Sequence, residues 1–88
     1  MKIERHLSFK KAYRKRVAHN EKLVAQTLER IALFQKNPKH PLLKDHGLTG
    51  SKRQHRSFCI TGDIRIIYYP TSQDHVIFLD IGTHNQVY

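Results

Sequence analysis

The last third of the chain places the strongest constraint on its fold. Residues 57–61 and 64–69 are two runs rich in β-branched and aromatic side chains, and Gly62-Asp63 separates them. Two such runs joined by a short glycine-containing turn are typical of an antiparallel hairpin. A third run of the same kind follows at 75–81. The sequence therefore predicts three consecutive strands, which commit the chain to a sheet.

The first half predicts helices instead. Ser8 is a suitable N-cap for a basic amphipathic segment, and residues 20–35 repeat apolar side chains at helical spacing until Asn37-Pro38 ends the pattern. Residues 1–6 alternate weakly and predict a short first strand. We therefore expect an α+β fold of order β-α-α-β-β-β, with two N-terminal helices packed on a small, mostly antiparallel sheet.

Prolines, glycines and polar side chains fill residues 38–55, which we expect to form an ordered loop without a regular element. Long connections inside compact domains are often functional. At 88 residues the chain has room for one core, so we expect a single domain over residues 1–88.

The charge of the chain is strongly positive. Sixteen Lys and Arg against seven Asp and Glu give a net charge of +9, and every Lys and Arg lies at or before Arg65. Such clustering favours a nucleic-acid partner, although a solvated helix face or an acidic protein partner would produce the same composition. The sequence shows no signal-peptide pattern and no apolar run of membrane-spanning length. We expect a cytoplasmic protein with no membrane partner.

The composition gives little sign of a metal or a cofactor. Cys59 is the one cysteine, and His55 is four residues from it. Within a strand that spacing is about 13 Å, too far for both to bind one ion. No cofactor-binding or metal-binding motif is present, so we expect neither group and interpret Cys59 as a packing residue.

Polar side chains stand out within the strands. Arg65 is in the middle of a hydrophobic strand, where its charge requires a partner. A phosphate would suit the guanidinium, and so would an ion pair with Asp63, Asp80 or a helix-capping carboxylate. His84 follows Gly82 and Thr83 just beyond the last strand, which suits a general acid or base.

Metal-free cleavage of RNA would need a base for the 2′-hydroxyl, a cation for the phosphorane and an acid for the leaving oxygen. The chain supplies side chains of these types at His46, Asp63, Arg65, His84 and Tyr88.

Three motifs together resemble one protein family. They are L-K-D-H-x-L-x-G at 43–50, R-S-x-x-I-x-G-D-x-R-I-x-Y at 56–68 and D-I-G-T-H-x-x-V-Y at 80–88. This combination resembles the RelE/ParE superfamily of type II toxins, and most closely its YafQ-like branch. The resemblance implies a ribosome-dependent mRNA interferase that is neutralised by a cognate antitoxin.

The resemblance also implies roles for individual residues. The catalytic set would be His46, Asp63, Arg65 and His84, and Tyr88 would stack on a base. Further contacts with mRNA and ribosomal RNA are expected from Lys44, Lys52, Arg53 and Arg56.

The chain departs from the YafQ pattern at two positions, with Cys59 in place of a histidine and Ile64 in place of a tryptophan. Two alternatives stay open: a ParE-like toxin that inhibits DNA gyrase, and a relative that binds an antitoxin or nucleic acid with little or no cleavage. His46 and His84 favour the nuclease, because a gyrase inhibitor has no need of them.

Overall fold

The computed structural model describes residues 1–88. In chain order its elements are β1 (Lys2–Arg5), α1 (Leu7–Arg16), α2 (Glu21–Lys36), β2 (His46–Gly47), β3 (Arg56–Cys59), β4 (Ile64–Ser72), β5 (His75–Thr83) and α3 (His84–Val87). Short 3₁₀ turns occur at Pro41–Leu43 and Gly50–Lys52. The sheet has the order β1-β5-β4-β3-β2, in which β1 runs parallel to β5 and all other pairs are antiparallel.

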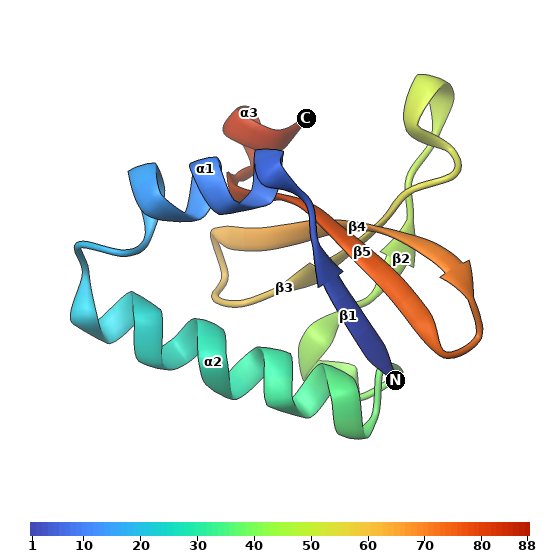
Figure 1. Ribbon diagram of the computed structural model, residues 1–88, viewed down its shortest axis with the longest axis horizontal. Coiled ribbons are helices and arrows are strands. Elements are labelled where there is room, and N and C mark those ends of the chain that lie inside the picture. Colours follow the sequence, from blue (N-terminus) through green and yellow to red (C-terminus); the bar gives the residue numbers. More distant parts are fainter.

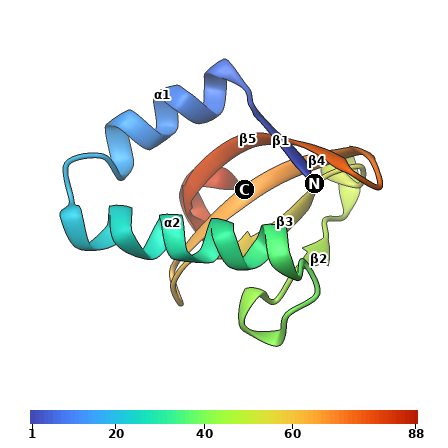
Figure 2. The same cartoon turned by 60° about the horizontal axis from the view of Figure 1, so that its bottom comes forward.

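The predicted α+β architecture is confirmed. Both long helices lie on the same side of the sheet, and β4 and β5 cross its middle (Figures 1 and 2). The three strands predicted in the last third are present, and β4 and β5 extend beyond the predicted ends. No helix has the length and apolar character needed to span a membrane.

The segment at 38–55 is more regular than expected. His46 pairs with Ser57 and Gly47 with Arg56, so this segment supplies the edge strand β2. A two-residue strand containing a glycine has little intrinsic β-propensity, and here it forms because β3 offers a free edge. The expectation of a loop without regular elements was therefore wrong for these residues.

Helix α1 begins differently from the prediction. The N-cap is His6, whose Nδ1 accepts a hydrogen bond from the Ser8 amide at 3.1 Å. The Ser8 hydroxyl instead donates to the carbonyl oxygen of Leu79 at 2.6 Å, so it contacts β5. Ser8 is therefore not the cap, because its hydroxyl bonds to a strand carbonyl and not to an amide of its own helix.

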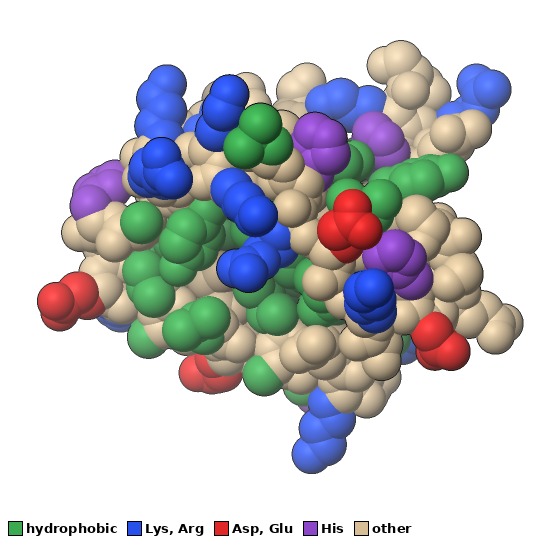
Figure 3. Space-filling model, in the orientation of Figure 1, with side chains coloured by type: hydrophobic (Ala, Val, Ile, Leu, Met, Phe, Trp, Pro, Cys, Tyr) green, Lys and Arg blue, Asp and Glu red, His purple; other side chains and the backbone are tan.

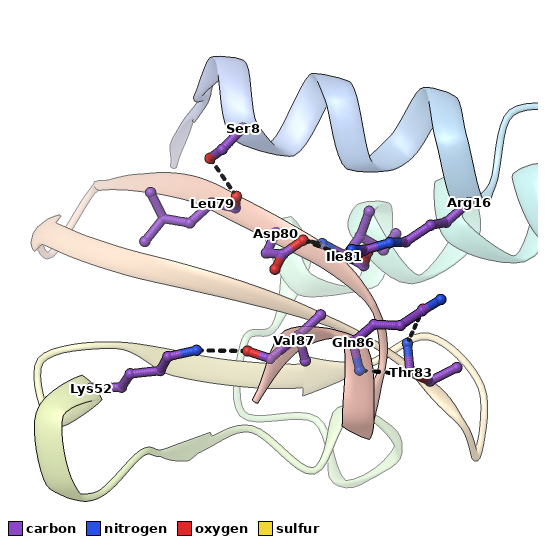
Figure 4. A network of polar contacts seen from close by, with 9 residues as sticks. All are labelled: Ser8, Arg16, Lys52, Leu79, Asp80, Ile81, Thr83, Gln86 and Val87. Atoms are coloured by element: carbon purple, nitrogen blue, oxygen red, sulfur yellow. Dashed lines mark hydrogen bonds and ion pairs between the residues drawn. The ribbon is translucent and has the colours of Figure 1, made fainter.

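That contact belongs to a wider arrangement along β5. Strand β1 pairs with residues 75–78 only, which leaves the second half of β5 without a strand on that side. There α1 runs alongside the strand, with Ser8 donating to Leu79 O and Arg16 Nη1 donating to Ile81 O at 2.9 Å (Figure 4). Side chains of α1 thus satisfy edge carbonyls that a neighbouring strand would otherwise satisfy.

An irregularity in the β4–β5 pairing decides which side chains of β5 face the core. Ile67 pairs with Asp80 but Tyr68 pairs with Phe78, so Leu79 is an extra residue. This bulge reverses the alternation, and Phe78 and Ile81 are therefore both buried. Asp80 is turned to the opposite, outer face of the sheet.

Helix α2 is attached to the sheet through an aromatic cluster. The Phe34 ring stacks on Phe58 with centroids 4.3 Å apart, and its centroid lies 5.0 Å from that of Tyr68. Phe34 is 1% exposed, and the same buried cluster includes Phe9 from α1 and Phe78 from β5. The core therefore lies between the two helices and one face of the sheet.

Replacing Phe34 with alanine should lower the free energy of unfolding by about 3–5 kcal/mol, because it removes a stacked ring and leaves a cavity. Leu28→Ala is the matched control on the same helix, since Leu28 is 60% exposed, and should change stability by less than about 0.5 kcal/mol. Urea unfolding followed by circular dichroism measures both. Equal losses for the two variants would contradict the proposed core.

Candidate functional site

Two segments far apart in the sequence form a hollow of about 450 Å³ on the outer side of the sheet. It is lined by His46, Gly47, Leu48, Thr49, Ser51, Lys52, His84 and Tyr88. We call it the histidine hollow. One wall is β2 with the residues that follow it, and the other is α3. The structure thus brings His46, Lys52, His84 and Tyr88 together, four of the residues that the sequence predicted.

A hydrogen bond to the backbone determines the tautomer of the His46 imidazole. Nδ1 of His46 lies 2.9 Å from the carbonyl oxygen of Lys44. Because a carbonyl oxygen only accepts hydrogen bonds, Nδ1 carries the proton and neutral His46 keeps its free lone pair on Nε2. His46 is exposed, so this nitrogen is available to take a proton from a bound molecule.

His84 and Tyr88 lie one turn apart on α3, where residues four apart are neighbours. Their ring centroids are 4.5 Å apart and inclined by 68°. The guanidinium carbon of Arg65 lies 5.7 Å from the centroid of the Tyr88 ring, which is within the range of a cation–π interaction. Arg65 is thereby connected to the histidine hollow through Tyr88.

Arg65 lies on the outer face of β4, between Cys59 of β3 and Gly82 of β5. Of its two expected aspartate partners, Asp80 pairs instead with Arg16 at 3.1 Å and Asp63 forms no ion pair. Arg65 itself takes part in no ion pair. Its Nε is buried without a hydrogen-bond partner. The guanidinium therefore keeps its hydrogen-bonding capacity for another partner.

A second hollow of about 480 Å³ adjoins the first. We call it the Arg65 hollow; it is lined by Arg30, Leu42, Lys44, His46, Cys59, Thr61, Gly62 and Arg65. His46 borders both hollows. Cys59 is half-buried here, directly opposite Arg65 in the sheet, and is therefore not enclosed in the core.

Three predicted residues lie outside both hollows. Asp63 is exposed in the turn between β3 and β4, and Arg53 is exposed just after the 3₁₀ turn at Gly50–Lys52. Arg56 is on the core side of β3, and its Nε and Nη2 both lie 2.7 Å from Oδ1 of Asp45. Strand alternation places Arg56 opposite to the face that bears Arg65.

Asp45 also accepts a hydrogen bond from the hydroxyl of Tyr68. Burial raises the pKa of Tyr68 well above its usual range, and the hydrogen bond to Asp45 raises this pKa further. The hydrogen bond to Asp45 likewise raises the pKa of Arg56 above its ordinary value. These contacts anchor the residue that immediately precedes His46, and so they hold β2 against the sheet.

Helix α3 was not predicted. Thr83 and Gln86 form a capping box, in which Gln86 Oε1 accepts from the Thr83 amide at 2.8 Å and Thr83 Oγ1 accepts from the Gln86 amide at 3.3 Å (Figure 4). A threonine three residues before a glutamine is the known spacing of this motif, so the sequence did contain a signal for α3. The role of Arg16 had no such signal, because its partners Asp80 and Ile81 are more than 60 residues away.

Comparison with known proteins identifies the family. The sequence matches, over residues 1–88, the family described as bacterial toxins of type II toxin-antitoxin systems, YafQ. The chain belongs to the YafQ family. The resemblance expected from the three motifs is therefore confirmed, and the protein is a toxin of the type II class.

Solved structures of toxins share the fold of this chain. A copper-bound mutant toxin from Helicobacter pylori is 25% identical, with a TM-score of 0.72, covering 100% of this chain and 99% of that one. YafQ in the E. coli DinJ-YafQ toxin-antitoxin complex is 24% identical, with a TM-score of 0.72 and coverage of 98% and 94%.

A YoeB/ParE toxin from Agrobacterium tumefaciens is 22% identical, with a TM-score of 0.77 and coverage of 96% and 99%. The similarities to YafQ in the DinJ-YafQ complex and to the YoeB/ParE toxin, both below 25% identity, show the fold alone. Comparison with curated proteins found no match. The chain itself has no group of three or more His, Cys, Asp or Glu side chains that could hold a metal ion.

The raised pKa of Tyr68 predicts a loss of stability in alkaline solution. An unfolded tyrosine ionises near pH 10, whereas folded Tyr68 keeps its proton to higher pH. The stabilisation from Tyr68 is thus complete below about pH 10 and falls as the pH rises above it. Tyr68→Phe, which has no proton to lose, should lose less stability than wild type between about pH 9 and pH 11.

Urea unfolding at several pH values measures this difference. Tyr13→Phe is the control, because it removes a hydroxyl but leaves Tyr68 and Asp45 in place. Its loss of stability between about pH 9 and pH 11 should equal that of wild type. Identical alkaline losses in wild type and Tyr68→Phe would show that Tyr68 is not the group responsible.

Proposed function

We propose that this YafQ-family toxin is a ribosome-dependent endoribonuclease that cuts mRNA by metal-independent acid–base catalysis. The observation that carries the proposal is the convergence of His46 and His84, from β2 and α3, on one hollow. Two imidazoles on facing walls offer a base and an acid to a phosphodiester bound between them. Arg65, which has no ion-pair partner, lies beside the same hollow as a cation for the phosphate.

The hydrogen bond at His46 supports an assignment of roles. With its proton held on Nδ1 by Lys44 O, His46 takes the proton of the 2′-hydroxyl through Nε2. The 2′-oxygen then forms a bond to phosphorus, and the bond from phosphorus to the 5′-oxygen breaks. His84, in its protonated form, donates a proton to that leaving oxygen. Arg65 stabilises the negative charge of the phosphorane between the two steps.

Tyr88 is suited to hold the base next to the cleaved bond. It is exposed, and one of its faces meets the Arg65 guanidinium. An aromatic ring backed by a cation is a good stacking surface for a nucleobase, and stacking of this kind tolerates every base.

The basic residues around the site support binding to RNA. A further hollow of about 480 Å³, the basic hollow, adjoins the histidine hollow at Lys52. Its basic side chains are Lys11, Lys15, Arg16, Lys52 and His55. Helix α1 therefore presents Lys11 and Lys15 beside the candidate site, where they can contact the phosphates of a longer strand or of ribosomal RNA.

The test is cleavage by purified protein and by induced protein in cells. His46→Ala and His84→Ala should each lower the rate of mRNA cleavage by about 10²- to 10⁴-fold, the usual loss when an acid or a base is removed. His19→Ala is the matched control, because His19 is exposed in the turn between the two long helices and far in sequence from the site. It should cut mRNA like wild type.

Mapping the 5′ ends of cellular mRNA after induction reports cleavage directly, and purified toxin with ribosomes and mRNA should remain active in the presence of a chelator. Intact transcripts together with accumulating gyrase-linked DNA breaks would support the ParE-like alternative and contradict the proposed endoribonuclease activity. Growth arrest with neither mRNA cleavage nor DNA breaks would support the remaining alternative, a toxin that acts by binding.

We also propose that a cognate antitoxin binds this toxin, as DinJ binds YafQ in the complex cited above. The surface that suits it is a groove of about 480 Å³ between α1 and α2. Its apolar lining residues are Phe9, Tyr13, Ala18, Leu28 and Ile31, and its basic ones are Arg5, Lys10 and Arg14. Figure 3 shows apolar side chains exposed in the band between these helices, with Lys and Arg around them.

A groove with this lining suits an amphipathic segment that has apolar and acidic faces. The charge of the toxin as a whole is +9, so an acidic antitoxin would be drawn to it from solution. The groove shares no lining residue with the histidine hollow, so an antitoxin segment bound in it would not fill that hollow.

Leu28→Glu should weaken binding of the antitoxin by about 10-fold or more, because it places a charge in the apolar part of the groove and repels an acidic partner. Isothermal titration calorimetry with the cognate antitoxin measures the change. Ala32→Glu, an exposed residue of the same helix outside the groove lining, is the control and should bind like wild type. Equal affinity for Leu28→Glu and wild type would place the antitoxin elsewhere.

A further inference from the structure

Helix α3 is too short to hold its own shape. It has four residues, whereas isolated helices below about 12–15 residues are marginal in water. His84 and Tyr88 are both at the ends of this helix, so their positions depend on contacts that other elements make with it. The structure provides such a contact at each end.

The contact at the C-terminal end comes from Lys52. Its Nζ donates a hydrogen bond to the carbonyl oxygen of Val87 at 2.7 Å (Figure 4). The last carbonyls of a helix have no partner within the helix, and a cation there is favoured by the helix dipole. Val87 itself is 2% exposed, so its side chain seats the same end of α3 in the protein.

The place of Lys52 in the chain gives this bond its importance. Lys52 ends the 3₁₀ turn at Gly50–Lys52, in the segment that starts with His46 and forms the wall of the histidine hollow facing α3. The Lys52–Val87 bond therefore connects the wall that bears His46 to the wall that bears His84.

The contact at the N-terminal end comes from Arg16. Its Nη1 donates to Asp80 Oδ1 at 3.1 Å and to Ile81 O at 2.9 Å, in the part of β5 that leads into α3. A Cβ on Gly82 would lie 2.9 Å from this Nη1 and 2.6 Å from Gln86 Oε1. Only glycine lets the guanidinium and the capping glutamine approach the chain together at this point.

We propose that Lys52 is a positioning residue, which fixes α3, and with it His84 and Tyr88, against the segment that bears His46, while Arg16 holds the start of α3. The expected effect of Lys52 on catalysis rests on the proposed function, whereas its expected effect on the position of α3 does not. It also changes the role that the sequence suggested for Lys52, from a direct contact with RNA to a bond within the protein.

The experiment compares Lys52→Met, which keeps the length of the side chain but loses its donor, with Lys52→Arg, which retains a donor. Lys22→Met is the control, an exposed lysine of α2 outside the hollows around the site. Two readouts are needed: the ¹H–¹⁵N NMR signals of the RNA-free protein, and single-turnover mRNA cleavage on ribosomes with saturating and subsaturating mRNA.

In Lys52→Met the amide signals of 84–88 should shift or broaden without RNA, while those of α2 stay in place. The cleavage rate at saturating mRNA should fall about 10- to 100-fold, the usual effect of a small misplacement of reacting groups, with half-saturation within about twofold of wild type. Lys52→Arg should restore most of the wild-type amide signals and most of the cleavage rate. Lys22→Met should match wild type in both measurements.

Unchanged α3 signals with weaker mRNA binding would overturn the proposal and make Lys52 a direct RNA contact. Unchanged signals and unchanged cleavage would deny Lys52 any role. If wild type cuts no mRNA, the proposed function fails, and the NMR signals of α3 still decide whether Lys52 positions it. Should Lys52→Met fail to fold, Lys52→Gln, whose shorter side chain does not span to Val87, takes its place with the same expected results.

Discussion

The free edge along the second half of β5, opposite to its pairing with β4, is the constraint on which the rest of the structure depends. A strand whose carbonyls lack partners is not stable when it is partly buried, and β1 ends too early to supply them. Side chains of helix α1 provide partners for two of these carbonyls: Ser8 donates to Leu79 O and Arg16 donates to Ile81 O. The position of the first helix, the end of the last strand and the start of α3 are therefore coupled in one arrangement.

Strand alternation then separates the structural side chains from the candidate site. Phe58, Ile66 and Phe78 face the helices and form the core, while Arg65 faces outward beside Cys59. The bulge at Leu79 keeps this separation intact, because it turns Asp80 away from the core. A protein of this size thus builds its stability on one face of a sheet and keeps the other face for polar groups.

Much of this organisation could be predicted from local patterns. The strands of the last third and the second helix have strong periodicity, and the family motifs point to His46, His84, Arg65 and Tyr88, which the fold gathers. The prediction failed where long-range contacts decide. β2 forms because β3 offers an edge, and the Ser8 hydroxyl bonds to a strand carbonyl instead of capping its own helix.

The sequence by itself determined the class of fold, the positive charge and the family, because periodicity, composition and motif spacing are properties of neighbouring residues. The tertiary structure alone decided which of the predicted residues share a hollow and what holds them there. Lys52 illustrates the difference: its charge suggested RNA, and its position places it on the carbonyl of Val87. Contacts between residues 35 positions apart depend on how the whole chain packs, and no local pattern encodes them.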